Sequence, residues 1–114
     1  MLIAKEFTFD SAHKLPNYNG LCANLHGHTY KLVVCLNGKI KEDGMVIDFS
    51  VLKQKVNDKV IKLLDHKFLN DLIDYPTAEN IAVWVWKRLI KELPQLYEIS
   101  LWETPTSHVI YRGD

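Results

Sequence analysis

The sequence has only two cysteines, Cys22 and Cys35, among its 114 residues. Two cysteines are too few for the disulfide framework that stabilises many small secreted domains. Residues 2–9 already have the pattern of a strand and include Lys5 and Glu6, so we expect no secretory leader at this end. These features indicate a cytoplasmic protein in which both thiols are free.

Long hydrophobic runs and an excess of either charge are also missing. The apolar runs are far shorter than the roughly 20 residues that span a membrane. The 14 basic and 14 acidic side chains give a formal net charge of zero. Binding to nucleic acid through its phosphates needs a basic excess or a basic stripe. We therefore expect neither a membrane nor a nucleic acid as the partner.

The hydrophobic periodicity and turn signals of the sequence predict one α+β domain over residues 1–114. Alternating and apolar patterns predict strands at 2–9, 28–36, 97–104 and 107–111, with an extended piece at 45–49. Helical spacing predicts helices over 51–64, after Ser50 as N-cap, and from Pro76-Thr77 to just before Pro94. Residues 10–27 and 65–75 read as loops. The order ββααββ predicts a four-stranded, largely antiparallel sheet with two helices on one face.

The predicted elements leave apolar surface uncovered. The strand over 28–36 is apolar on both faces, and Trp84 and Trp86 lie about 200° apart around their helix. One chain of this length has too few elements to cover both surfaces. We therefore expect a homo-oligomer that closes the sheets against one another.

The most informative motif is Leu25-His26-Gly27-His28, which enters a predicted strand. Residues i and i+2 of a strand face the same side, so the two imidazoles can converge on one ion. A hairpin of the first two strands would bring His13 beside them. Three neutral imidazoles suit Zn2+ and leave a fourth position open, as in catalytic sites. Taken alone, an H-x-H pair is as easily a chance feature of the surface.

Two further features each have two interpretations. Cys22 lies four residues before His26 and is either a fourth ligand of a closed structural zinc site or a reactive thiol whose pKa the ion lowers. Asp65-His66 follows the first predicted helix and is either a proton relay or a helix-terminal histidine beside a solvated carboxylate. Local chemistry singles out neither Glu103, at a strand end, nor Thr77, a helix N-cap.

Taken together, FDSAHKL, Cys22-x3-His26-Gly27-His28, LDHKFLN, PTAENIA and WETPTSHVIYRG resemble the 6-pyruvoyltetrahydropterin synthase family over about residues 3 to 113. The resemblance implies the tunnelling fold, in which ββααββ subunits join their sheets into a barrel. It also implies a hexamer built as a dimer of trimers, in agreement with the uncovered apolar surface.

The resemblance also implies roles for individual residues. His13, His26 and His28 would be the zinc ligands, and Cys22 would be the general base with Asp65 and His66 as its partners. Glu103 would bind the guanidine-like edge of the pterin ring as a bidentate carboxylate, and Thr77 would lie by the same ring. The triphosphate of the substrate requires cationic side chains to bind it. Lys14, Lys31 and Arg112 are the candidates, and the sequence does not indicate which of them binds it.

The spacing Cys22-x3-His26 resembles the 6-carboxytetrahydropterin synthase branch, which serves 7-deazapurine (queuosine or archaeosine) biosynthesis. The implied reaction converts 7,8-dihydroneopterin triphosphate to 6-carboxy-5,6,7,8-tetrahydropterin and releases acetaldehyde and triphosphate. The 6-pyruvoyltetrahydropterin synthase reaction is the alternative within the family. A non-catalytic zinc protein, with Cys22 and the three histidines in a closed site, is the alternative from another class.

Overall fold

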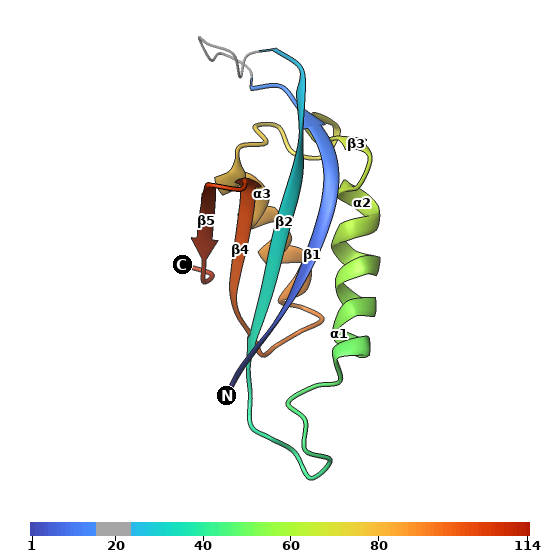
Figure 1. Ribbon diagram of the computed structural model, residues 1–114, viewed down its shortest axis with the longest axis vertical. Coiled ribbons are helices and arrows are strands. Elements are labelled where there is room, and N and C mark those ends of the chain that lie inside the picture. The colour runs from blue at the N-terminus through green and yellow to red at the C-terminus, as the bar shows by residue number, and fades with distance from the viewer. Residues whose placement is uncertain (16–23) are drawn as a thin grey trace.

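The computed structural model describes residues 1–15 and 24–114, and a long antiparallel hairpin dominates its fold (Figure 1). Strand β1 (Leu2–His13) pairs with β2 (His26–Asn37) from Leu2↔Asn37 to His13↔His26. The predicted loop over 10–27 was therefore wrong at both ends. Pairing with the opposite strand extends each strand beyond the point where its own side-chain pattern is clear.

In the part of the chain that the structure describes, the sheet has five strands in the order β3-β1-β2-β4-β5. β4 (Leu96–Thr104) and β5 (Ser107–Tyr111) agree with the predicted strands to within one residue. The fifth strand, β3 (Lys67–Phe68), was not predicted, and it pairs in parallel with Ser11 and Ala12 of β1. Two residues are too few to show a period, so only the tertiary contact defines this strand.

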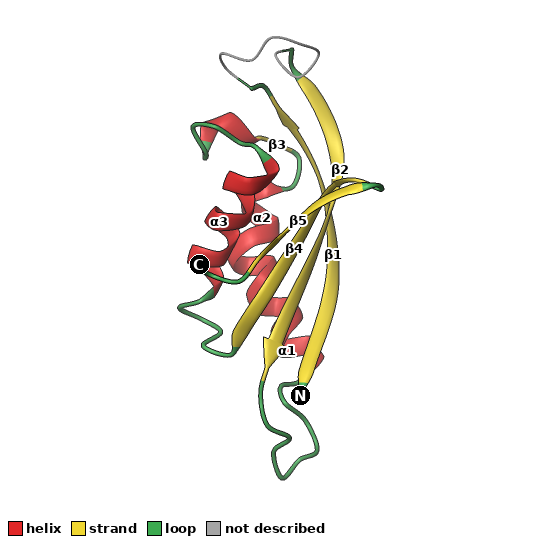
Figure 2. Ribbon diagram, turned by 90° about the vertical axis from the view of Figure 1, so that its left-hand side faces the viewer, coloured by secondary structure: helices red, strands yellow, loops and turns green. Residues whose placement is uncertain are grey.

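Helices cover one face of this sheet (Figure 2). The first helical stretch consists of α1 (Phe49–Val56), the π-helical turn η2 (Asn57–Ile61) and α2 (Lys62–Leu64). After the 3-10 turn η3 (Leu69–Asp71), α3 (Ala78–Leu89) forms the second. Helical spacing predicts buried faces with Leu52, Val56, Val60 and Leu63 on the first helix and Ile81, Ala82, Val85 and Leu89 on the second. All of these side chains are buried except Leu63, which is half-buried while Leu64 is buried in its place. In the described ranges, none of these helices has the length and hydrophobicity needed to cross a membrane.

The start of the first helix differs from the prediction. Its N-cap is Asp48 rather than Ser50, because the Asp48 carboxylate accepts hydrogen bonds from the Ser50 N–H at 2.8 Å and the Ser50 hydroxyl at 2.7 Å. These bonds lower the pKa of Asp48. The predicted extended piece at 45–49 was wrong, because residues 46–47 form a bend and Phe49 already belongs to α1. The second helix begins as predicted, with Thr77 as its N-cap, but it ends at Leu89 and a turn replaces the predicted helix before Pro94.

The core lies between the sheet and the helices and leads directly to the candidate site. Phe7 and Phe9 of β1 and Tyr30 and Leu32 of β2 face the helices and are buried. Because alternate residues of a strand share a face, the same side of the hairpin continues from this core to the histidines at its end.

Candidate metal centre and active site

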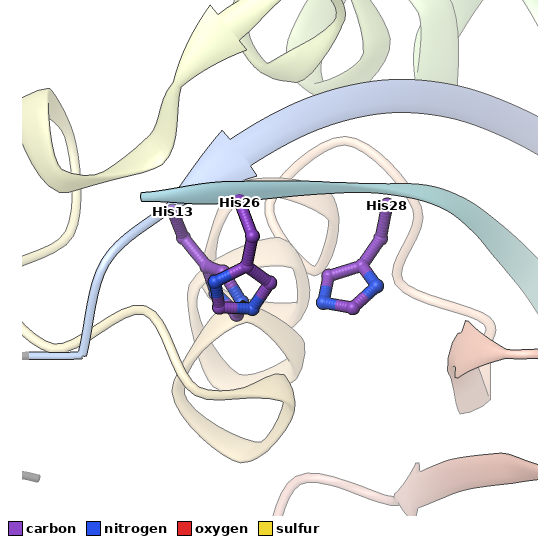
Figure 3. A group of neighbouring side chains, drawn as sticks. All are labelled: His13, His26 and His28. Carbon is purple, nitrogen blue, oxygen red and sulfur yellow. The ribbon is translucent and has the colours of Figure 1, made fainter. Parts of the chain in front are cut away.

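Three histidines converge on the helix-facing side of the hairpin end (Figure 3). His13 lies opposite His26 in the register, and His28 follows two residues later on β2. One ring nitrogen of each histidine lies within 4.8 Å of one ring nitrogen of each of the others. A Cβ at Gly27, between them, would lie 3.4 Å from the Ser11 carbonyl oxygen, which is an ordinary contact distance. The structure thus brings together the three residues that the sequence singled out.

Backbone carbonyls orient two of the three rings. The Nδ1 of His13 donates to the Pro76 carbonyl oxygen at 2.8 Å, and the Nδ1 of His26 donates to the Asn24 carbonyl oxygen at 2.7 Å. A carbonyl only accepts, so the proton lies on Nδ1 in both rings and Nε2 has a lone pair. The two Nε2 atoms are 2.9 Å apart. Two lone pairs at this separation repel each other unless a shared proton or a metal ion lies between them.

His28 completes the donor set. Its Nε2 atom is buried and has no hydrogen-bond partner among the residues that the structure describes. Burial lowers the pKa of His28, and the nearby His13 and His26 add to this effect, while the Glu103 carboxylate opposes it. A neutral imidazole is the form that binds a metal. Nitrogen ligands of a tetrahedral zinc ion lie about 3.3 Å apart for Zn–N bonds of about 2.0–2.1 Å. The three histidines therefore fit a zinc ion.

Tyr30 lies beneath the histidines and was not singled out by the sequence analysis. Its ring is fully buried, stacks on Phe9 with the centroids 5.0 Å apart, and meets His28 edge to face with the centroids 5.6 Å apart. Burial and the charge of Glu103 raise its pKa, so the hydroxyl stays neutral. The sequence could have indicated that Tyr30 lies near the histidines, because it follows His28 by two residues and that spacing places both side chains on one face of the strand.

Glu103 lies next to the histidines despite its distance in the sequence. Its Oε1 atom is 3.6 Å from Nε2 of His28. The β2–β4 pairing ends at Lys31↔Trp102, and β2 continues past the end of β4 (Figure 1). A pocket of about 520 Å³ opens at this point and is lined by His28, Lys31, Trp102 and Glu103 among others. A pocket of this size suits a small molecule.

Asp65 and His66 form the close pair that a proton relay needs. Asp65 Oδ2 lies 3.0 Å from Nδ1 of His66, and Asp65 Oδ1 accepts the Asp10 backbone N–H at 2.9 Å. This N–H lowers the pKa of the Asp65 carboxyl, and His66 adds to the effect. The backbone N–H of His66 in turn donates to the Asp10 carbonyl oxygen at 2.6 Å. His66 has a φ of 58°, which is uncommon for a residue with a side chain.

The structure does not place this pair beside the three histidines of the same chain. Lys67, which follows His66, pairs with Ser11, and Ser11 pairs on its other side with His28. The pair is therefore two strand spacings from His28, or about 10 Å. The His66 side chain is 77% exposed. His66 and His28 nevertheless both line one pocket of about 590 Å³ within the chain.

Three residues that the sequence analysis discussed remain, namely Thr77, Cys22 and Cys35. The Thr77 hydroxyl oxygen accepts the Asn80 N–H at 3.2 Å as the cap of α3, directly after the Pro76 carbonyl that orients His13. Cys22 lies in residues 16–23, outside the described residues. Cys35 is buried in the sheet, and burial raises the pKa of its thiol, with the Glu98 charge adding to the effect.

Comparison with known proteins defines the class. The sequence profile described as 6-pyruvoyl tetrahydropterin synthase matches residues 2–114. A 6-carboxy-5,6,7,8-tetrahydropterin synthase of Synechocystis sp. is 41% identical over 118 residues, covering 96% of this chain and 92% of the relative. A dihydroneopterin monophosphate aldolase of Pyrococcus furiosus is 48% identical over 101 residues, covering 84% of this chain and 83% of the relative.

The fold leads to the same class. The solved structure of Caenorhabditis elegans 6-pyruvoyl tetrahydropterin synthase matches with a TM-score of 0.90 at 27% identity, covering 100% of this chain and 96% of that one. The chain belongs to the 6-pyruvoyl tetrahydropterin synthase family and is an enzyme of that family. The resemblance that the sequence motifs indicated is confirmed.

Proposed function

We propose that this chain is a zinc-dependent enzyme that converts 7,8-dihydroneopterin triphosphate to 6-carboxy-5,6,7,8-tetrahydropterin and releases acetaldehyde and triphosphate. The observation that carries the proposal is the convergence of His13, His26 and His28 next to the carboxylate of Glu103. The 41% identity to the Synechocystis 6-carboxytetrahydropterin synthase supports this choice of reaction. With this reaction, the enzyme would act in the cytoplasm, in the pathway that makes the precursor of 7-deazapurines.

The three histidines would hold zinc through their ring nitrogens and leave one position open for the substrate. When bound, zinc supplies Lewis acidity, which acidifies the hydroxyl groups and the neighbouring C–H bonds of the substrate side chain. The carbonyls of Pro76 and Asn24 keep two of the rings in the binding tautomer.

Glu103 would orient the substrate. A carboxylate accepts two parallel hydrogen bonds from a guanidine-like N–H edge, which the pterin ring has. Because Glu103 is 3.6 Å from His28, a ring bound there would lie next to the histidine site. Thr77 would contact the ring by donating its hydroxyl hydrogen, since its oxygen already accepts from Asn80.

The proton transfers would use Cys22 as general base together with Asp65 and His66. Asp65 holds Nδ1 of His66 and leaves Nε2 of that ring to exchange a proton. The pair is two strands from His28 in its own chain, so we propose that His66 of a second copy completes the site. Joining of the sheets into a barrel, in a hexamer of two trimers, would provide that copy.

A second candidate reaction has support from one observation. The 48% identity to the Pyrococcus furiosus dihydroneopterin monophosphate aldolase favours cleavage of the same side chain on a monophosphate. Elimination to 6-pyruvoyltetrahydropterin is a further alternative within the family. In the alternative from another class, Cys22 closes a structural zinc site and there is no turnover.

Product analysis tests the proposal. The zinc-loaded protein is incubated with dihydroneopterin triphosphate, and separately with the monophosphate, and the products are identified by mass spectrometry together with an enzymatic assay for acetaldehyde. We expect acetaldehyde and 6-carboxytetrahydropterin from the triphosphate. Triphosphate release without acetaldehyde would instead indicate the pyruvoyl reaction. Cleavage of the monophosphate to a phosphorylated two-carbon aldehyde would indicate the aldolase, and His28→Ala serves as the inactive control.

A further inference from the structure

The pocket beside Glu103 is lined by residues whose side chains leave the sheet on both of its faces. His28 and Glu103 lie on the helix-facing side, whereas Lys31, three residues after His28, leaves β2 on the opposite side. The β2–β4 pairing ends at Lys31↔Trp102, and beyond it the described residues of β2 and β4 are not paired with each other. One pocket of about 520 Å³ is lined by both Glu103 and Lys31.

Lys31 provides a cation in this pocket that has no anionic partner. Among the described residues, no carboxylate lies within ion-pairing distance of its ammonium, which sits 4.5 Å from the centroid of the Trp102 ring. His108 stacks on Trp102 with the ring centroids 3.7 Å apart and so supports the indole. A contact with an aromatic face leaves ammonium N–H groups available to an acceptor.

The other two candidate cations are placed differently. Arg112 donates to Glu98 from both Nε and a terminal nitrogen, each at 2.9 Å, which raises its pKa and neutralises its charge locally. Lys14 follows the end of β1, where its backbone is paired with Asn70, and it does not line the pocket. Of the pocket-lining residues that the structure describes, Lys31 alone is a lysine or arginine.

We infer that Lys31 binds a phosphate group of the substrate and selects phosphorylated pterins over unphosphorylated ones. The inference rests on the proposed function and assigns the phosphate end of the same substrate. A ligand with N–H donors at one end and an anion at the other matches a pocket with a carboxylate at one side and an ammonium at the other. Lys31 thus determines which ligand binds. It takes no part in the reaction, which is assigned to the residues around His28.

Equilibrium binding tests this assignment without depending on turnover. The dissociation constants of dihydroneopterin and of dihydroneopterin monophosphate are measured by calorimetry for the zinc-loaded wild type and for Lys31→Met, which keeps the packing on Trp102 and removes the charge. We expect a loss of about tenfold or more for the monophosphate, as for a charge-assisted hydrogen bond, and a change below about twofold for dihydroneopterin. Lys31→Arg should stay close to the wild type.

Arg112→Met is the matched control, because it removes a cation that is already paired, and it should leave both dissociation constants unchanged. Equal losses for both ligands in Lys31→Met, or no loss for either, would overturn the inference. A wild type that binds the monophosphate through Lys31 but forms no product from dihydroneopterin triphosphate refutes the proposed reaction and leaves the inference standing. A wild type that binds neither pterin refutes both. Zinc content and thermal unfolding of each variant show that its fold is intact.

Discussion

His13 and His26 face each other across the end of the β1–β2 hairpin with their Nε2 atoms 2.9 Å apart, while a backbone carbonyl binds Nδ1 of each ring. The carbonyl acceptors keep both lone pairs directed at the same point. Without a cation between them, this arrangement raises the free energy of the folded state. The site is therefore pre-organised for a metal ion, and binding of that ion should stabilise the fold.

The first prediction concerns zinc content. The purified protein should hold about one zinc ion per chain, and His26→Ala or His28→Ala should lose most of it, because two ligands bind zinc far more weakly than three. A chelator should lower the melting temperature of the wild type. Elemental analysis measures the content, with His108→Ala as the control, because His108 stacks on Trp102 and is not one of the three clustered histidines. Full zinc retention in both ligand variants would refute the assignment.

The second prediction concerns Cys22. As the general base, Cys22→Ala should keep its zinc while turnover falls by about two to four orders of magnitude, the usual range for positioned acid–base catalysis. Cys35→Ala is the matched control, because Cys35 is buried away from the histidines and should affect stability only. If Cys22→Ala sheds its zinc, the cysteine is a ligand and the closed structural site is correct. Near-normal activity would place the base elsewhere.

The third prediction concerns Glu103. Glu103→Gln should keep the zinc and the fold but lower kcat/KM by about tenfold or more, because charge-assisted hydrogen bonds are worth about 1.5–3 kcal/mol each. Steady-state kinetics with the zinc-loaded protein measure the change. Glu98→Gln is the control, since that carboxylate pairs with Arg112 and does not line the pocket. Unchanged kinetics for Glu103→Gln would remove this residue from the site.

The fourth prediction concerns the pair Asp65–His66 and assembly. Analytical ultracentrifugation at micromolar concentration should show an oligomer. His66→Ala and Cys22→Ala should each be nearly inactive, and co-assembly of the two variants should restore part of the activity, because some sites would combine an intact Cys22 with an intact His66 from another copy. A monomeric protein, or no restoration in verified mixed oligomers, would contradict a site shared between copies.

The fifth prediction concerns acid stability. The pKa of Asp65 is lower in the folded state than in the unfolded chain, where it is about 3.9, so the ionised carboxylate stabilises the fold above that pH. This contribution is lost as the pH falls through the folded pKa. The melting temperature of Asp65→Asn should therefore lie below that of the wild type near pH 7, and the gap should close below about pH 4. Both proteins are measured without metal, so that loss of zinc from the histidines at low pH does not affect the comparison. A difference in melting temperature that persists at low pH would refute the role of the Asp65 charge.

Much of this molecule follows from local rules of the sequence. The i, i+2 spacing of His26 and His28 on a strand predicts that both rings share a face, and the hairpin order of the first two strands predicts His13 beside them. Helical spacing likewise predicted the buried faces of the helical stretches, and alternation predicted β4 and β5. These features depend on backbone geometry over a few residues, which is why the sequence alone determines them.

Only the tertiary structure decided the features that join distant segments. Backbone pairing with β2 extends β1 to His13, and the Asp10 N–H binds Asp65 from 55 positions away. The end of the β2–β4 pairing opens the pocket that Lys31 and Glu103 share. Neither the short strand β3 nor the place of Glu103 beside His28 leaves a periodic signal in the chain, because each depends on which strands pair and where that pairing stops.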